Sequence, residues 1–400
     1  VLLTLMYGFV GLNRVSIAYV FPLIIPAFHL QYWQAGLLVS VTSGAWVIST
    51  WVGGHLSDRR GRRPVLAWGL TGAAVVTALT GVASGFGSLV ALRTLVGFGD
   101  GVGWSVGQSL VFETAPTRHR GLAQGLMTGG YTLIGSGIGA VVVTKLAAQV
   151  GWRPLFPAIG LLLLIVTAWL GWVLPRQQGL RGEPGPGLVQ GLSQLLRTRA
   201  IYPLMAMSVC TLGWLQVLIG FNTLFLTRVY HLSLAEAGVI GSLSGFVGFV
   251  GQLVVPHLSD RVGRRKSLIA AGALSAITLG LYTFVRVPPL WLAVLSALSG
   301  FAGYGLLPVA TATAVAEQVS PGLVGAATGW INAVGGVFGA LVMPLVAGLA
   351  AGTMGLTAAL GLAVLLQLAI VPLAAALGET APVALDRARS TGDERLSAPR

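Results

Sequence analysis

The chain is divided into about twelve apolar segments, each long enough to cross a lipid bilayer as a helix. Charged residues make up only 9% of the 400 residues and apolar residues 55%. A soluble protein of this length needs roughly a quarter of its residues charged to cover its surface. We therefore expect an all-α integral membrane protein with transmembrane helices at 1–28, 33–53, 65–85, 87–114, 122–148, 154–174, 201–228, 234–256, 267–285, 289–316, 323–350 and 354–377.

The basic residues lie where the positive-inside rule would place them. The chain has a formal net charge of +13, and most of its Lys and Arg residues fall in the loops after every second apolar segment and in the polar C-terminal tail. This distribution predicts that both termini are cytoplasmic. Because the sequence has no basic stripe with interleaved aromatic residues, we do not expect a nucleic-acid partner. The short loops, without a targeting extension, indicate a bacterial inner membrane.

Several kinds of chemistry are excluded by the reactive residues. The single cysteine, Cys210, lies within an apolar segment, and the five histidines are scattered without the spacing of metal ligands. The sequence also shows no nucleophile–base pair, so we expect neither an enzyme nor a metal or cofactor site. Because Val1 already lies within an apolar run, we expect the native start to lie upstream.

The two halves of the chain repeat each other. The sequence GHLSDRRGRR at 54–63 returns as PHLSDRVGRR at 256–265, an offset of 202 positions. Glu113 has a counterpart in Glu317, 204 positions later. Two copies of one six-helix unit explain this pattern, and many transporters are built in this way. We therefore predict an N-terminal bundle at 1–175, a cytoplasmic linker at 176–200, a C-terminal bundle at 201–377 and a cytoplasmic tail at 378–400.

The repeated loop resembles the signature motif of the major facilitator superfamily. That resemblance covers all twelve segments and implies two pseudo-symmetric bundles that transport by alternating access. It also implies a charge cluster that holds one conformation together and breaks when the bundles rock. Basic loops alone would satisfy the positive-inside rule, but they would not explain an aspartate at the same position twice. The residues expected in the cluster are Asp58, Arg59, Arg62, Glu113, Asp260, Arg261, Arg264 and Glu317.

Three ionisable residues lie inside apolar segments, where a charge is costly and usually functional. Arg14 lies in the first segment, and Arg93 and Asp100 lie in the fourth. Arg93 and Asp100 are two helical turns apart, so they share one face of their helix, about 10 Å apart along its axis. Two arginines against one aspartate leave a positive charge that suits an anion. A structural Arg93–Asp100 ion pair is the alternative explanation.

The patterns N-R-x-S at 13–16 and R-x6-D-G at 93–101 resemble those of the anion:cation symporter family within this superfamily. That family carries hexuronates, aldonates, sialic acid and related organic acids together with protons. The resemblance implies that Arg14 and Arg93 bind the substrate carboxylate and that Asp100 carries the proton. The family pattern has an aspartate where this chain has Asn13, so one proton-binding carboxylate is missing and the stoichiometry is open.

Polar residues near mid-membrane in the second half are further candidates for substrate binding. Asn222 and Asn332 carry amides that could hydrogen-bond substrate hydroxyls, although an interhelical hydrogen bond would explain them equally well. Trp104, Tyr131 and Gln108 are weaker candidates, because aromatic and amide side chains at helical spacing usually serve packing.

We thus predict a secondary transporter of a small organic anion, such as a sugar acid, with proton symport. The alternatives are a drug or metabolite proton antiporter and an organophosphate antiporter of the same superfamily. Two arginines at membrane depth disfavour cationic drugs. An organophosphate antiporter would have another basic residue in the seventh segment, where Asn222 and Thr223 stand. A membrane receptor on the same scaffold is a further possibility. Carriers that resemble this chain function as monomers, and we expect the same here.

Overall fold

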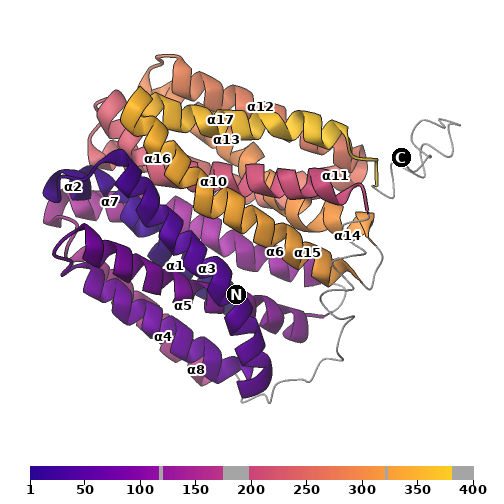
Figure 1. Cartoon of the computed structure of the whole chain (residues 1–400), viewed down its shortest axis with the longest axis horizontal. Helices are drawn as coiled ribbons and strands as arrows, with labels where there is room; N and C mark the ends of the chain where they lie inside the picture. The colour runs from indigo at the N-terminus through magenta and orange to yellow at the C-terminus, as the bar shows by residue number, and fades with distance from the viewer. Residues whose placement is uncertain (117–119, 174–197, 320–322, 381–400) are drawn as a thin grey trace, which may run out of the picture. The chain divides into compact units, whose positions relative to one another are not determined.

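The computed structural model describes residues 1–116, 120–173, 198–319 and 323–380, and its regular elements in these ranges are all helical (Figure 1). Long apolar segments form helices because a helix satisfies all its backbone hydrogen bonds internally. The first half contains α1 (Leu2–Tyr19), α2 (Phe21–Ala27), α3 (Tyr32–Arg60), α4 (Arg62–Thr80), α5 (Phe86–Thr114), α6 (Arg120–Gly130), the π-helical η2 (Tyr131–Ile138), α7 (Gly139–Val150) and α8 (Leu155–Val173).

The second half follows the same plan. It contains α10 (Ile201–Val229), α11 (Leu234–Val262), α12 (Arg264–Phe284), α13 (Pro289–Pro308), the π-helical η3 (Val309–Thr313), α14 (Ala314–Gln318), α15 (Val324–Val334), the π-helical η5 (Gly335–Val342), α16 (Met343–Met354) and α17 (Leu356–Ala375). The prediction of an all-helical chain is confirmed.

Each of the predicted apolar segments contains one or more of these helices. Ten helical stretches in the described ranges are long and apolar enough to cross a membrane. Helices α4 and α5 are not among the ten, although they are 19 and 29 residues long. The chain therefore has multiple candidate spans, and the count of twelve stays a prediction. The segment predicted at 1–28 is interrupted, because α1 ends at Tyr19 and α2 begins at Phe21.

The internal repeat is visible in the backbone as well as in the sequence. The residues with positive φ in the described ranges form three pairs: His29 (50°) with His231 (56°), Gly61 (91°) with Gly263 (115°), and Gly151 (78°) with Gly355 (88°). The members of each pair are 202 or 204 positions apart. Helices η2 and η5 are also 204 positions apart. Because positive φ is uncommon, and rarer still outside glycine, this agreement supports duplication of one structural unit.

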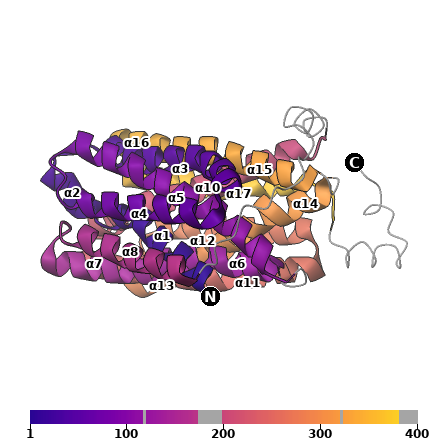
Figure 2. The same ribbon diagram turned by 90° about the horizontal axis from the view of Figure 1, so that it is seen from below.

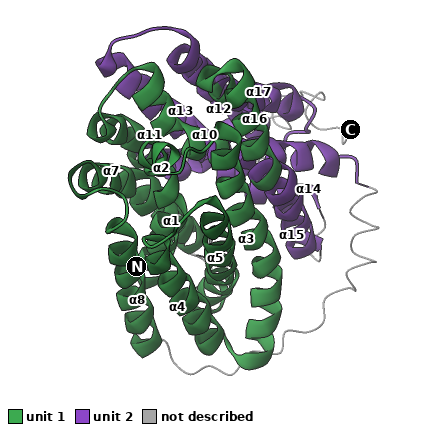
Figure 3. Cartoon of the chain, turned by 60° about the vertical axis from the view of Figure 1, so that its left-hand side comes forward, with its two compact units in different colours: residues 1–181, 216–246, 341–360 green, residues 182–215, 247–340, 361–400 purple. Residues whose placement is uncertain are grey.

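The described chain divides into two compact units, coloured separately in Figure 3. Unit 1 comprises Val1–Arg181, Gln216–Phe246 and Leu341–Leu360, and unit 2 comprises Gly182–Leu215, Val247–Ala340 and Gly361–Arg400. Within the described residues, the boundaries of the units fall in α10, α11, η5 and α17. The predicted linker at 176–200 lies largely outside the described residues, as does most of the tail at 378–400. The predicted bundle boundaries therefore stay predictions.

Within unit 1, close helix packing places the middle of α5 against its neighbours. Helix α5 packs on α3 and α4, and α4 packs on α8 (Figure 2). A Cβ atom at Gly97 or Gly101 would overlap backbone atoms of Thr42 or Trp46 on α3. The glycines of α5 thus allow its backbone to approach α3, as small residues do in membrane helices. Helix α1 packs against η2, α6 and α8 in the same unit.

Candidate functional site

The middle of α5 carries a buried carboxyl group whose direct partner comes from α1. Asp100 and Asn13 have no exposed surface, and Asn13 Nδ2 donates a 3.0 Å hydrogen bond to Asp100 Oδ1. Asp100 Oδ2 is buried without a hydrogen-bond partner. Asn13 Oδ1 in turn accepts a hydrogen bond from the Thr77 hydroxyl on α4. Three helices therefore meet at the Asn13 side chain, and one carboxyl oxygen is left available.

Arg93 is held in the same region by different partners. Its guanidinium is fully buried and donates to Thr80 Oγ1 at 2.6 Å and to the backbone oxygen of Asn13 at 3.4 Å. The guanidinium carbon lies 5.4 Å from the centre of the Phe156 ring on α8, within the range of a cation–π contact. Arg93 thus links α5 to three other helices: to α1 through the backbone oxygen of Asn13, to α4 through the Thr80 hydroxyl, and to α8 through the Phe156 ring.

The alternative of an Arg93–Asp100 ion pair is not realised: the Arg93 guanidinium donates to Thr80 and to the backbone of Asn13, and the Asp100 carboxyl accepts from the Asn13 side chain. Asn13 connects the two instead, through its backbone oxygen to Arg93 and its side chain to Asp100. From the sequence, Asn13 was noted only as the residue that replaces an aspartate of the family pattern. The structure shows it as the residue that joins this network, named here the Asn13 network (Asn13, Thr77, Thr80, Arg93 and Asp100).

Arg14 is the one of the three mid-helix charges with exposed surface. Its Nη2 donates to Ser43 Oγ on α3 at 3.0 Å, and its guanidinium lies 4.9 Å from the centre of the Trp46 ring. The Nε atom of Arg14 is buried without a hydrogen-bond partner. A partly exposed guanidinium with an unused donor is suited to bind an anion.

Ser43 also accepts a hydrogen bond from Gln216 of α10, with Nε2 to Oγ at 2.8 Å. Gln216 is the repeat counterpart of Arg14, 202 positions later, and it belongs to unit 1 together with Arg14 and Ser43. Repeat-related side chains therefore converge on one hydroxyl. Sequence reasoning missed Gln216, although the repeat offset applied to Arg14 would have identified it.

The two asparagines predicted as substrate ligands lie in different units. Asn222 in unit 1 is buried beside α11, where a Cβ atom at Gly241 would lie 3.3 Å from Asn222 Nδ2. Asn332 in unit 2 donates from Nδ2 to the backbone oxygen of Thr328 at 2.8 Å and to that of Thr311 at 3.3 Å. The second bond joins two segments of unit 2, which is the structural role foreseen as the alternative.

The first copy of the repeated motif forms an ion-pair cluster centred on Arg62, the first residue of α4. Arg62 Nη1 lies 2.6 Å from Asp58 Oδ1, and Arg62 Nη2 lies 3.0 Å from Glu113 Oε1 at the end of α5. Arg62 Nη1 also donates to Ser57 Oγ at 2.6 Å. The expected pairing of Glu113 with a motif arginine is present. Arg59 is exposed.

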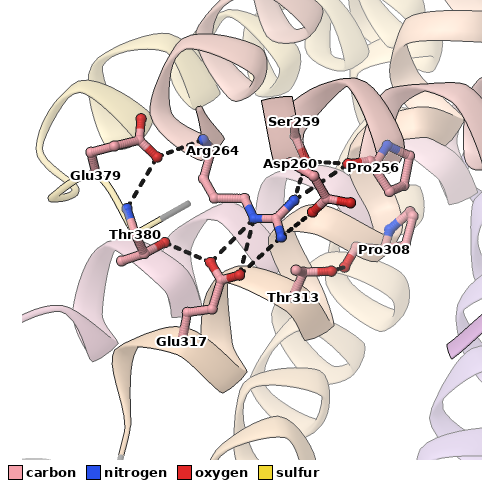
Figure 4. Close-up of polar contacts among 9 residues, drawn as sticks. All are labelled: Pro256, Ser259, Asp260, Arg264, Pro308, Thr313, Glu317, Glu379 and Thr380. Atoms are coloured by element: carbon pink, nitrogen blue, oxygen red, sulfur yellow. Dashed lines mark hydrogen bonds and ion pairs between the residues drawn. The ribbon is translucent and has the colours of Figure 1, made fainter. Parts of the chain in front are cut away.

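The second copy builds the same cluster around Arg264 and adds two residues (Figure 4). Arg264 pairs with Asp260 and, at 2.9 Å, with Glu317 Oε1, and it donates to Ser259 Oγ. Arg261 is exposed. From the chain beyond α17, Glu379 Oε1 accepts a 2.7 Å hydrogen bond from the backbone nitrogen of Arg264, and the Thr380 hydroxyl donates to Glu317 Oε2 at 2.6 Å. Glu379 therefore caps the N-terminus of α12.

Comparisons with known proteins agree with this architecture. The probable 4-methylmuconolactone transporter of Cupriavidus pinatubonensis is 29% identical over 297 residues, which cover 72% of this chain and 69% of that protein. The gallate transporter of Pseudomonas putida is 27% identical, with 69% and 68% covered. The sialic acid transporter NanX of Escherichia coli is 25% identical, with 75% and 73% covered.

A solved structure and a family model lead to the same fold. The crystal structure of a bacterial homologue of the human lysosomal transporter Spinster superposes with a TM-score of 0.77 at 19% identity, and 94% of each chain is covered. The model of the Major Facilitator Superfamily matches residues 3–344 and 215–398. The chain therefore belongs to the Major Facilitator Superfamily and is a multi-pass membrane transporter rather than an enzyme.

Proposed function

We propose that this protein transports a small organic anion together with protons, by alternating access. The observation that carries the proposal is the placement of Arg14, a partly exposed cation with an unused donor, in the same unit as Asp100, a buried carboxyl group with an unused oxygen. Ionisable groups at membrane depth are expensive and usually serve transport. The names of the relatives, which include a gallate and a sialic acid transporter, support an organic-acid substrate.

Arg14 is assigned to the substrate carboxylate. A guanidinium binds a carboxylate through parallel hydrogen bonds. In this structure, one donor of Arg14 is hydrogen-bonded to Ser43. Gln216 shares that serine, so it would hold the serine in place when the anion draws Arg14 away. Asn222 and Asn332 are proposed to contribute amides to the rest of the substrate; for Asn332 this requires release of its bonds to Thr311 and Thr328.

Arg93 is proposed to support the anion site from within the protein. Because its guanidinium is buried and donates to Thr80 and Asn13, its contribution in this conformation is to position Asn13 and to add positive potential. Direct binding of the substrate by Arg93 would require it to exchange these partners for the carboxylate in another conformation of the transport cycle.

Asp100 is assigned to the coupling proton. A neutral carboxylic acid is far cheaper to bury than a carboxylate, and Asp100 is fully buried with one hydrogen bond from Asn13. Arrival of a proton on Oδ2 and of an anion at Arg14 together would leave the local charge unchanged. Joint loading would therefore lower the cost of moving a negative substrate through the closed state.

The Arg62 and Arg264 clusters are proposed to hold one conformation of the transporter and to separate during the cycle. Each cluster joins the ends of three helical segments through one arginine. Asp58 and Asp260 are exposed, and ion pairs of exposed carboxylates break at modest cost, which suits contacts that form and dissolve at each turnover.

Uptake into proteoliposomes with an alkaline lumen tests the function. The panel contains benzoate, glucuronate, sialic acid, glycerol phosphate and the cation tetraphenylphosphonium. We expect the protein to raise the accumulation of a carboxylate above its level in protein-free liposomes when the outside is acid, and a protonophore to abolish this excess. Exchange of glycerol phosphate without carboxylate uptake would indicate an organophosphate antiporter. Proton-driven movement of the cation alone would indicate a drug exporter, and either result would overturn the proposal.

A further inference from the structure

Four aromatic side chains from four helical segments of unit 1 form a continuous cluster, named here the aromatic cluster. The ring centres of Tyr7 on α1 and Trp104 on α5 are 4.9 Å apart, and those of Tyr7 and Tyr131 on η2 are 5.8 Å apart. Trp46 on α3 extends the cluster, with its ring centre 6.0 Å from that of Trp104. Separations of this size are those at which aromatic rings interact.

The aromatic cluster is joined to the proposed anion site. The Arg14 guanidinium lies 4.9 Å from the centre of the Trp46 ring. Trp104 lies one helical turn beyond Asp100. Two members of the aromatic cluster are therefore next to the groups to which the transported anion and proton are assigned, Trp46 by contact with Arg14 and Trp104 by its place on the same helix as Asp100.

Packing alone does not account for the aromatic cluster. Trp46 and Trp104 are only half-buried, unlike the Trp214–Tyr304 pair of unit 2, whose members are 0% and 1% exposed. The hydroxyl of Tyr131 is buried without a hydrogen-bond partner, although the residue as a whole is 9% exposed. Buried hydroxyl groups nearly always have a partner. Partly accessible indoles and an unused phenol point to a ligand that completes the site.

The aromatic cluster has no counterpart in the second repeat. At the offsets of 202 and 204 positions, the counterparts of its members in the second half are Val209, Gly248, Pro308 and Gly335. None of these is aromatic. Helix α1 accommodates one of the rings through Gly11, where a Cβ atom would come within 2.7 Å of Tyr131 Cδ2. The four rings therefore occur only in the repeat that also contains the mid-helix charges.

From this arrangement we infer that the transported anion is a planar carboxylate with an aromatic or conjugated ring. The inference rests on the proposed function: the carboxylate binds Arg14 while the flat ring packs against the partly exposed indoles of Trp46 and Trp104. A ring hydroxyl or carbonyl of the substrate would pair with the Tyr131 hydroxyl. A saturated ring carries its hydrogens above and below the ring plane, so it cannot approach an indole face as closely as a flat ring does.

Paired substrates test the inference. Benzoate and cyclohexanecarboxylate have the same number of carbon atoms and the same charge, and they differ in planarity. Each is measured as an inhibitor of exchange of a transported carboxylate by purified protein in proteoliposomes. We expect benzoate to inhibit at a concentration at least about tenfold lower than cyclohexanecarboxylate, a factor typical of pocket shape discrimination. Equal inhibition, or stronger inhibition by the saturated acid, would overturn the inference while leaving anion transport intact.

Variants locate the preference. Trp104→Leu should reduce the preference for benzoate to about twofold or less, while the concentration of cyclohexanecarboxylate needed for inhibition stays nearly constant. Trp68→Leu is the matched control, because Trp68 is 79% exposed and lies outside the aromatic cluster. If Trp104→Leu is poorly folded, Trp104→Phe should keep the preference, and quenching of tryptophan fluorescence by benzoate should persist in that variant. An unchanged preference in Trp104→Leu would refute the assignment. If the wild type exchanges no carboxylate at all, the proposed function fails as well.

Discussion

The two repeats have the same ion-pair cluster at their motif loops but different side chains in the middle of their helices. Arg62 with Asp58 and Glu113 corresponds to Arg264 with Asp260 and Glu317. Where the first repeat has Asp100, the second has Tyr304, whose ring centre lies 5.4 Å from that of Trp214.

The difference separates two tasks that the fold performs. We propose that the motif clusters recur because both repeats make and break contacts at the same step of the cycle. The mid-helix charges occur in one repeat only, as the proposed function would require, because a single substrate and its proton need one set of ligands. Arg14 and Gln216 show this difference between the repeats most clearly. They occupy equivalent positions and donate to the same serine, but only Arg14 is charged.

The largest expected effect comes from giving the first repeat the side chain of the second. Arg14→Gln keeps a hydrogen-bond donor for Ser43 but removes the charge that binds the substrate carboxylate. We expect the initial rate of anion uptake to fall about 100-fold, equivalent to roughly 3 kcal/mol, since losing one partner of a buried charge pair costs 2–5 kcal/mol.

The measurement is carboxylate uptake into proteoliposomes at matched protein content. The control variant is Gln216→Asn, which keeps an amide at the equivalent position and adds no charge. It should lower uptake less than about tenfold. Uptake by Arg14→Gln within a factor of about three of the wild type would remove Arg14 from the substrate site.

A smaller effect, equal in the two repeats, is expected from the motif clusters. Arg62→Gln and Arg264→Gln each remove two ion pairs, and each should lower the uptake rate about tenfold, or roughly 1.4 kcal/mol. The exposed neighbours Arg60→Gln and Lys266→Gln are matched controls in charge and should change the rate less than twofold, in line with the small value of surface charges. A loss confined to one repeat would contradict the shared role of the clusters.

The smallest effect concerns the contacts that the chain beyond α17 makes with the second cluster. Glu379→Ala removes the acceptor for the first backbone nitrogen of α12 and should destabilise the protein by about 1 kcal/mol, as the loss of a helix cap does. Glu379→Gln keeps an acceptor oxygen and should destabilise the protein by about half as much as Glu379→Ala. Thermal unfolding in detergent measures both. Equal stability of Glu379→Ala and the wild type would show that the cap contributes nothing.

The general fold and both ion-pair clusters could be predicted from the sequence, because the length of the apolar segments and the near-identical repeated motif can be read from the chain directly. The partners of Asp100 could not, because they depend on how α1 and α4 pack against α5. Helical spacing placed Arg93 on the same face as Asp100, yet Asn13 connects the two. Asn13 and Thr77 were visible as polar residues in apolar segments, but spacing along one helix does not show which side chains meet across helices.

The most direct test of the central claim separates coupling from transport in Asp100→Asn. This variant keeps a polar side chain of the same size beside Asn13 but cannot bind the coupling proton. In proteoliposomes, we expect it to exchange labelled for unlabelled carboxylate at a rate within about threefold of the wild type. Accumulation driven by an inward proton gradient should be lost, whereas the control variant Tyr304→Phe should accumulate the anion as the wild type does. Full gradient-driven accumulation by Asp100→Asn would show that the proton is carried elsewhere.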